Sequence, residues 1–185
     1  MKGSLNQISD IRFGYYAKPE ERGEVPYLQA RQFDEYGILL DESNEFVPLD
    51  NKTKQHQLRD GDVLFVGKGS RLFAWCYRQI AGPYIASSIF FVLRPDQHIL
   101  YPEYLTAVLN APQSKAIFLQ IGGGTNIFSI RKSELGAFEI PVPTMPQQIK
   151  IAALTALHNE EVALAKQLIE QKQNFYTAII SKLIK

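Results

Sequence analysis

The last part of the chain, from Thr144 to Lys185, contains no glycine, and its only proline, Pro146, lies where a helix would begin. Thr144 and Gln147, three residues apart, are suited to bind the amides that the first turn of a helix leaves unpaired. Pro146 has no amide and is tolerated in that turn. From Gln147 to about Ile184 the helix would extend on the order of 55 Å at 1.5 Å per residue. The sequence therefore predicts one long C-terminal helix.

Apolar residues recur along this segment at spacings of three and four, which is typical of one apolar helix face. The predicted seam consists of Leu154, Leu157, Leu164, Leu168, Phe175, Ile179 and Leu183. Glu161 and Lys172 interrupt it. A stripe of this length favours pairing with a helix of another chain over folding back onto its own domain, which is the alternative.

Residues 1–143 differ from this segment, because glycine and proline divide them into short apolar runs. Residues 63–66, 85–93 and 138–142 are predicted strands, since they are rich in β-branched and aromatic residues. Residues 102–109 and 114–119 read as short helices. Strands and helices do not alternate regularly, so we expect an α+β domain over residues 1–143, with a mixed, strongly twisted β-sheet. The long coiled-coil-type helix follows over residues 144–185.

Composition excludes several classes of protein. No apolar run approaches the roughly 20 residues that cross a bilayer, and no signal peptide is evident, so we expect a cytoplasmic protein. One cysteine and three scattered histidines give no metal-ligand spacing, and Cys76 between Trp75 and Tyr77 reads as a buried apolar residue. The net charge of only +1 means that any DNA affinity must come from local clusters or from a partner.

Three segments combine flexible backbone with side chains that can contact phosphates and base edges. The predicted DNA-binding residues are Gln29, Arg31 and Gln32 in the first segment, Lys68, Ser70 and Arg71 in the second, and Thr125, Asn126, Ser129, Arg131 and Lys132 in the third. Glycines precede or lie among the predicted DNA-binding residues of the second and third segments. Taken alone, each segment is more typical of an ordinary surface turn than of a DNA contact.

Catalytic motifs are absent from the sequence. The run Gly122-Gly123-Gly124 is not followed by the lysine and serine of a phosphate-binding loop, nor does it match a dinucleotide-binding pattern. We find no nucleophile elbow, no paired histidines for zinc, and no site for amino-methylation of a base. The sequence therefore predicts a protein without an active site, without a metal and without a cofactor of its own.

The order of the remaining motifs resembles the specificity subunit of type I restriction-modification systems. The resemblance is carried by the stretches RDGDVLF (59–65), ASSIFFVLRP (86–95), YPEYL (101–105), residues 124–130, and IPVP (140–143) followed by Gln148 and Ile151. In that family a target-recognition domain is followed by a helical region, and full-length members carry this unit twice with the two helices antiparallel. This sequence contains the unit once.

The resemblance implies a half-subunit that recognises double-stranded DNA and catalyses nothing itself. Such a chain is expected to form an antiparallel homodimer through the seam and to read an interrupted palindrome. Its further partners would be methyltransferase subunits, which bind S-adenosylmethionine, and a restriction or translocase subunit.

Two other functions remain open from the sequence. A coiled-coil scaffold without DNA specificity would use the same helix, and sequence-selective, salt-sensitive DNA binding distinguishes the two. An independent DNA nuclease would need a cluster of carboxylates that the sequence does not bring together.

Overall fold

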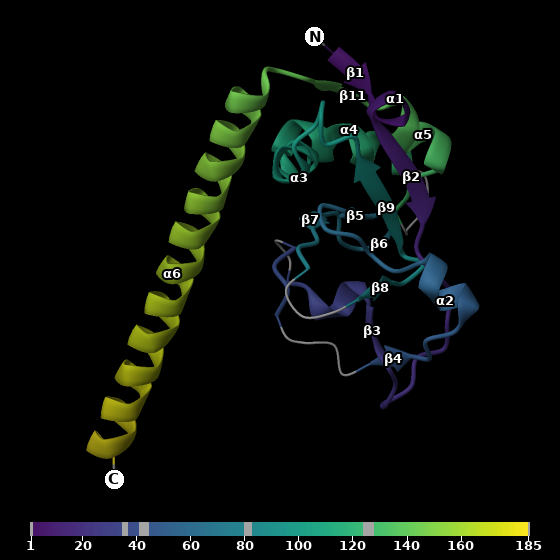
Figure 1. The fold of residues 1–185 in the computed structure, drawn as a ribbon. Coiled ribbons are helices and arrows are strands. Elements are labelled where there is room, and N and C mark those ends of the chain that lie inside the picture. Colours follow the sequence, from purple (N-terminus) through teal and green to yellow (C-terminus); the bar gives the residue numbers. More distant parts are fainter. Residues whose placement is uncertain (1, 35–36, 41–44, 80–82, 124–127, 185) are drawn as a thin grey trace. The chain divides into compact units, whose positions relative to one another are not determined.

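The protein is described from a computed structural model, which covers residues 2–34, 37–40, 45–79, 83–123 and 128–184. The chain divides into two compact units, residues 1–149 and 150–185 (Figure 1). The first unit contains all the described β-strands and short helices, and the second contains most of the long helix α6 (Met145–Leu183). The predicted α+β class and the long C-terminal helix are confirmed.

The largest sheet of the described residues has four antiparallel strands in the order β2-β9-β5-β7. Their bounds are β2 (Ser9–Phe13), β9 (Phe90–Pro95), β5 (Val63–Val66) and β7 (Ala74–Cys76). All four residues of β5 are buried, because the strand is central and both its faces are covered. Leu64 and Val66 join an apolar cluster on one face, while Phe65 packs against Phe118 with ring centroids 4.9 Å apart. This burial explains why β5 has a continuous apolar sequence.

A three-stranded sheet and two strand pairs complete the described β-structure. In the three-stranded sheet β3 (Val25–Leu28) pairs antiparallel with β4 (Phe46–Val47) and parallel with β8 (Ile85–Ala86). The pairs are β1 (Lys2–Ser4) with β11 (Glu139–Pro141), and β6 (Lys68–Gly69) with β10 (Phe128–Ser129).

The single strand predicted over residues 85–93 is wrong, because the structure divides it between two sheets. β8 ends at Ala86 and β9 begins at Phe90. Between them the amide of Ser87 donates to Leu28 O at 2.8 Å, and the amide of Phe90 donates to Ser87 O at 3.0 Å. The turn moves the chain from one sheet to the next, which an uninterrupted apolar sequence does not reveal.

Short helices cover the sheets of the first unit. They are α1 (Leu5–Ile8), the 3-10 helix η1 (Ala30–Gln32), α2 (Asn51–Gln55), α3 (Pro102–Asn110), α4 (Pro112–Gly122) and α5 (Lys132–Ala137). α3 and α4 both start at a proline, which has no amide that would need a partner in the first helical turn. The helix predicted over residues 114–119 therefore begins two residues earlier than expected. None of the described helices combines the length and the apolarity that crossing a bilayer needs.

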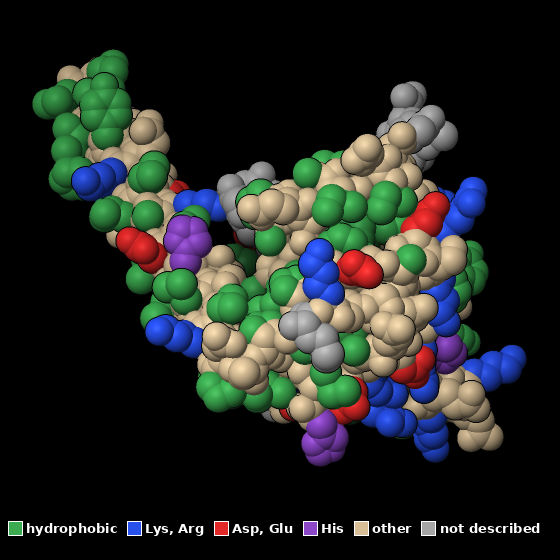
Figure 2. All heavy atoms as spheres, turned by 90° about the horizontal axis from the view of Figure 1, so that it is seen from above, with side chains coloured by type: hydrophobic (Ala, Val, Ile, Leu, Met, Phe, Trp, Pro, Cys, Tyr) green, Lys and Arg blue, Asp and Glu red, His purple; other side chains and the backbone are tan. Residues whose placement is uncertain are grey.

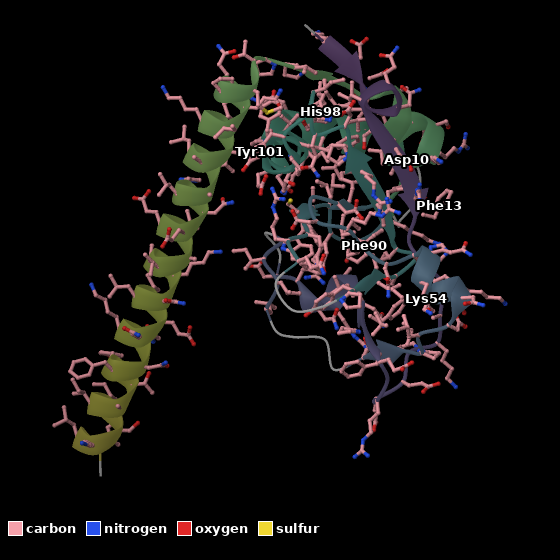
Figure 3. All side chains as sticks on the ribbon, viewed as in Figure 1. Asp10, Phe13, Lys54, Phe90, His98 and Tyr101 are labelled. Atoms are coloured by element: carbon pink, nitrogen blue, oxygen red, sulfur yellow. The ribbon has the colours of Figure 1, made fainter. Side chains whose placement is uncertain are left out.

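An aromatic cluster fills the core between the two larger sheets. The ring of Phe33 lies 5.1 Å from that of Phe73, 5.3 Å from that of Trp75 and 5.8 Å from that of Phe90. Phe90 is seen inside the first unit in Figure 3. Because Phe33 follows η1 and Phe73 follows β6, this packing fixes the segments that carry two of the three predicted DNA-binding groups.

The first turn of α6 is capped as the sequence predicts. Thr144 O accepts the amides of Gln147 and Gln148 at 2.9 and 3.0 Å, and the Gln147 side chain accepts the Thr144 amide at 3.1 Å. The side chain of Gln148 is buried in the first unit. The predicted division of the chain at residue 143 stays a prediction; the helix itself begins at Met145.

Candidate nucleic-acid interface

Loops from distant parts of the chain meet at one end of the four-stranded sheet, where β2 and β5 end and β9 begins. The amide of Gly14 after β2 donates to Phe90 O at 2.9 Å, and the amide of Gly67 after β5 donates to Ile89 O at 3.0 Å. Gly67 O in turn accepts the amide of Ile130 at 2.9 Å. We call residues 13–17, 66–71, 86–90 and 128–130 the loop edge.

Gly14 lets two of these loops approach closely. A Cβ atom at this position would lie 2.1 Å from Ser87 O and 2.8 Å from Ala86 O, well inside van der Waals contact. The close approach is continued by the amide of Tyr15, which donates to Ala86 O at 2.8 Å. The loop after β2 is therefore fixed against the turn between β8 and β9.

The strand pair β6–β10 joins two of the predicted DNA-binding segments. Lys68 lies opposite Ser129, and Gly69 lies opposite Phe128. Lys68, Ser70 and Ser129 are all exposed. A cation and two hydroxyl groups are thus held on a short, paired piece of backbone, which suits contacts to phosphates.

Arg71 connects the first predicted segment, residues 29–32, to the same edge through hydrogen bonds within the fold. Its guanidinium donates to Phe33 O at 2.6 Å and to Ala30 O at 2.7 Å, and the side chain is half-buried. These bonds hold η1 beside the loop after β6. Two N–H groups of Arg71, a side chain predicted to contact DNA, therefore donate to backbone carbonyls within the protein.

The polar side chains of η1 and its N-cap also have partners within the protein. Gln29 Nε2 donates to Glu45 Oε2 at 2.7 Å, and Arg31 forms an ion pair with the same carboxylate. The side chain of Gln32 accepts the amide of Gln29 at 2.8 Å. The sequence did not predict Glu45 as the shared partner of Gln29 and Arg31. Glu45 is distant from both in the sequence, and no local pattern identifies it.

The structure also shows a hollow of about 370 Å³ that the sequence did not indicate. Its lining is mostly apolar and includes buried Tyr27 together with Ala17, Pro19, Ala30 and Ile89. Tyr16, with 83% of its surface exposed, borders the hollow beside Gln29, Arg31 and Ser88. The run from Phe13 to Lys18, aromatic residues next to a cation, is the sequence signal that marks this place.

The remaining predicted residues do not belong to the loop edge. Lys132 borders a different hollow of about 890 Å³, beside Asp10 and Arg94. Asp10 and Phe13 lie at opposite ends of β2 in Figure 3, so this second hollow is at the other end of the sheet from the loop edge. Arg131 is exposed and precedes α5, where its amide donates to Glu134 Oε2 at 2.7 Å. Thr125 and Asn126 lie outside the described residues.

Comparison with models of protein families shows the family to which the chain belongs. A profile of the type I restriction modification DNA specificity domain matches residues 4–172, which is most of the sequence. The chain belongs to this family. The match includes the first unit and much of α6, so the resemblance inferred from the motifs is confirmed.

Three solved structures, two of them of S subunits, share the fold. The chain is 18% identical to the S subunit from M. genitalium (TM-score 0.61, 92% of this chain and 41% of that one). It is 18% identical to the HsdS subunit from Thermoanaerobacter tengcongensis (TM-score 0.54, 90% and 39%). A third match comes from work on complex assembly and conformational transition of the type I R-M system (22% identity, TM-score 0.58, 90% and 40%).

The specificity-domain chain thus spans about two fifths of the length of these three chains. No curated protein matches it significantly. The family is non-catalytic and carries no cofactor, in agreement with the sequence prediction.

Burial raises the pKa of the Cys76 thiol to about 12, so the thiol is not a nucleophile at neutral pH. Within the described ranges no three His, Cys, Asp or Glu side chains are grouped to hold a metal ion.

Proposed function

We propose that this specificity domain reads one half of a bipartite DNA target and directs separate methyltransferase and restriction subunits to it. In this proposal residues 1–143 recognise DNA and residues 144–185 join two copies. The partner subunits bind S-adenosylmethionine and perform the chemistry.

The observation that supports DNA reading most directly is the meeting of three segments at the loop edge. Residues near 30, 70 and 129 are far apart in the sequence, yet β6–β10 pairing and the two bonds from Arg71 hold them together. Lys68, Ser70 and Ser129 are the exposed polar groups of this arrangement, and Tyr16 adds an exposed aromatic ring. A cation beside hydroxyl groups suits phosphates, and an aromatic ring or apolar hollow suits the edge of a base.

The weak overall charge is compatible with this role. A net charge of +1 supplies little non-specific attraction to DNA, so phosphate contacts from partner subunits are needed for tight binding. The 22%-identical match comes from work on the assembly of a type I system, which supports, by analogy, assembly with partner subunits here. The Gln29, Arg31 and Lys132 contacts to DNA stay part of the proposal.

Homodimerisation through α6 is supported by its exposed seam. Leu154, Leu157 and Phe175 have 68%, 64% and 69% of their surface exposed. Figure 2 shows hydrophobic side chains along α6, with charged ones between them. Covering this face with a second copy would remove it from water and would give two identical domains, which suit an interrupted palindrome.

The first test is selection from random duplex DNA, with the full chain and its methyltransferase subunit together. We expect enrichment of two inverted half-sites at one fixed spacing. Enrichment of no sequence above background would overturn the DNA-reading proposal and favour the scaffold.

Light scattering on the intact chain tests the homodimer separately. We expect the mass of a dimer, and a folded monomer for the double variant Leu157→Asp/Leu168→Asp, because buried aspartates would oppose pairing. A monomeric intact chain would remove the symmetric target from the proposal while leaving the loop edge to be tested by selection.

A further inference from the structure

Between Leu154 and Ile179 the seam face of α6 is apolar except at two positions of opposite charge. Beyond Ile179, the exposed Lys182 also falls on this face. At about 100° per residue, the seven seam positions from Leu154 to Leu183 fall within an arc of about 100° around the helix. Glu161 and Lys172 fall within the same arc, and both are exposed. A partner for this face must therefore match an apolar stripe and also satisfy one carboxylate and one ammonium group.

We propose that a second copy of this chain covers the face as an antiparallel helix, with the two-fold axis at residues 166–167. The proposal rests on the homodimer of the proposed function and adds its register. In this register the opposed residues of the two copies are Leu154 with Ile179, Leu157 with Phe175, Glu161 with Lys172, and Leu164 with Leu168. Each opposed pair is centred on residues 166–167 to within half a residue.

Self-complementarity is the reason for this register. The spacing of seam residues read forward from Leu154 matches the spacing read backward from Ile179 to within one residue at each position. Between Leu154 and Ile179, apolar residues then meet apolar residues in every layer but two, and Leu183 lies opposite Ile149 and Lys150 at each end. In those two layers Glu161 of one copy meets Lys172 of the other, which satisfies both charges at once.

Other arrangements of two copies leave these charges in unfavourable places. In a parallel, in-register pair Glu161 of one copy faces Glu161 of the other, and the two Lys172 residues face each other. Like charges then meet across the interface. An antiparallel pair shifted by one heptad places Glu161 opposite Ile179 and Lys172 opposite Leu168. Each charge would then lose water without gaining a partner.

The axis has a consequence for the target. Because the proposed two-fold axis relates the two copies, both domains are attached at equal distances from it. That is the geometric condition for reading two inverted half-sites at one spacing.

Charge exchange tests the register on the full chain by sedimentation equilibrium. Glu161→Lys alone and Lys172→Glu alone each place like charges together twice per dimer, and each should raise the dimer Kd at least tenfold. The double variant Glu161→Lys/Lys172→Glu restores opposite charges and should return Kd to within about threefold of the original. All these effects should diminish in high salt.

Glu170→Lys is the matched control, because Glu170 is exposed and lies on the opposite side of the helix from the seam. Its Kd should stay within about threefold. A dimer that no single exchange weakens, or that the double exchange fails to restore, would overturn the register but leave the homodimer. A monomeric intact chain would overturn the homodimer as well, while selection of DNA still tests the recognition function.

Disulfide formation gives a second test that does not depend on affinity. In a Cys76→Ala background, Leu157→Cys and Phe175→Cys on one chain should cross-link two copies under oxidising conditions. Either single variant should stay uncrosslinked, because its two cysteines would lie about 27 Å apart, beyond the roughly 7 Å that a disulfide allows between Cα atoms. Efficient cross-linking of a single variant would show a parallel pair and overturn the proposal.

Discussion

The side chain of Gln148, in the first turn of α6, accepts a hydrogen bond from the backbone amide of Tyr101 at 2.8 Å. Its Nε2 donates to Ile99 O and to Pro143 O, both at 2.9 Å. One buried amide therefore satisfies three backbone groups from the segment before α3 and from the entry to α6. Tyr101 and nearby His98 are labelled in Figure 3.

Replacing this amide should destabilise the first unit. Gln148→Leu introduces an apolar side chain of similar size. It leaves the Tyr101 amide and two backbone carbonyls without this partner, so we expect a loss of about 2–4 kcal/mol in the free energy of unfolding. Urea denaturation followed by fluorescence measures it. Gln173→Leu, at an exposed position of α6, is the control and should change stability by less than about 0.5 kcal/mol.

The ion pair between Arg94 and Asp62 should contribute more to the free energy of unfolding than the exposed pair between Arg12 and Asp10. Arg94 donates to both carboxylate oxygens at 2.7 Å, and the Asp62 side chain is only 1% exposed. Arg94→Met strands a buried carboxylate and should cost about 3–5 kcal/mol. Arg12→Met removes a pair with Asp10 in which both side chains are about half exposed, and should cost less than about 1 kcal/mol. Equal losses in thermal or chemical unfolding would contradict this ranking.

Substitutions at Lys68 and Arg71 should have different effects, the first on DNA binding and the second on the free energy of unfolding. Lys68→Ala removes an exposed cation, so we expect weaker binding to the selected DNA, with a salt dependence reduced by about one phosphate contact and unchanged unfolding. Arg71→Ala removes the guanidinium that donates to Ala30 O and Phe33 O, so it should lower the free energy of unfolding by about 1–3 kcal/mol. The check is to titrate DNA at several salt concentrations and to unfold both variants under the same conditions.

Tyr16 should contribute to DNA binding without supporting the fold. Its ring is 83% exposed, so Tyr16→Ser should change stability by less than about 0.5 kcal/mol. Binding to the selected duplex should weaken by about tenfold if the ring packs on DNA. Ile99→Ser replaces a partly exposed apolar side chain outside the loop edge and is the control. Unchanged affinity of Tyr16→Ser would remove this residue from the interface.

Cys76 should resist alkylation in the folded protein. Because burial raises its pKa to about 12, only about one thiol in ten thousand is ionised at pH 8, against roughly a quarter for an ordinary cysteine. We expect iodoacetamide to react at least about a thousandfold more slowly with the native protein than with the urea-unfolded chain. Since the folded pKa is the higher one, raising the pH toward 12 should increase the native rate. Rapid native labelling at pH 8, followed by mass spectrometry, would contradict this.

Several elements could be predicted because their signals are local. The capped start of α6, the apolar β5 strand and the start of α3 at Pro102 each depend on residues within a few positions of one another. The register proposed for α6 depends only on the spacing of residues along one helix. The family could be inferred from the order of short motifs, and the match over residues 4–172 confirms it.

The sequence by itself thus determined the α+β class, the long helix and the segments that carry polar groups near residues 30, 70 and 129. Only the tertiary structure decided which of these groups share an edge, that Arg71 binds carbonyls of the η1 region, and that Lys132 lies at the other end of the sheet. It also placed Glu45 beside Gln29 and Arg31, and left Tyr16 exposed beside an apolar hollow. The physical reason is range: helix and strand patterns repeat within a few residues, whereas these contacts join loops brought together by packing around Phe33, Phe73 and Phe90.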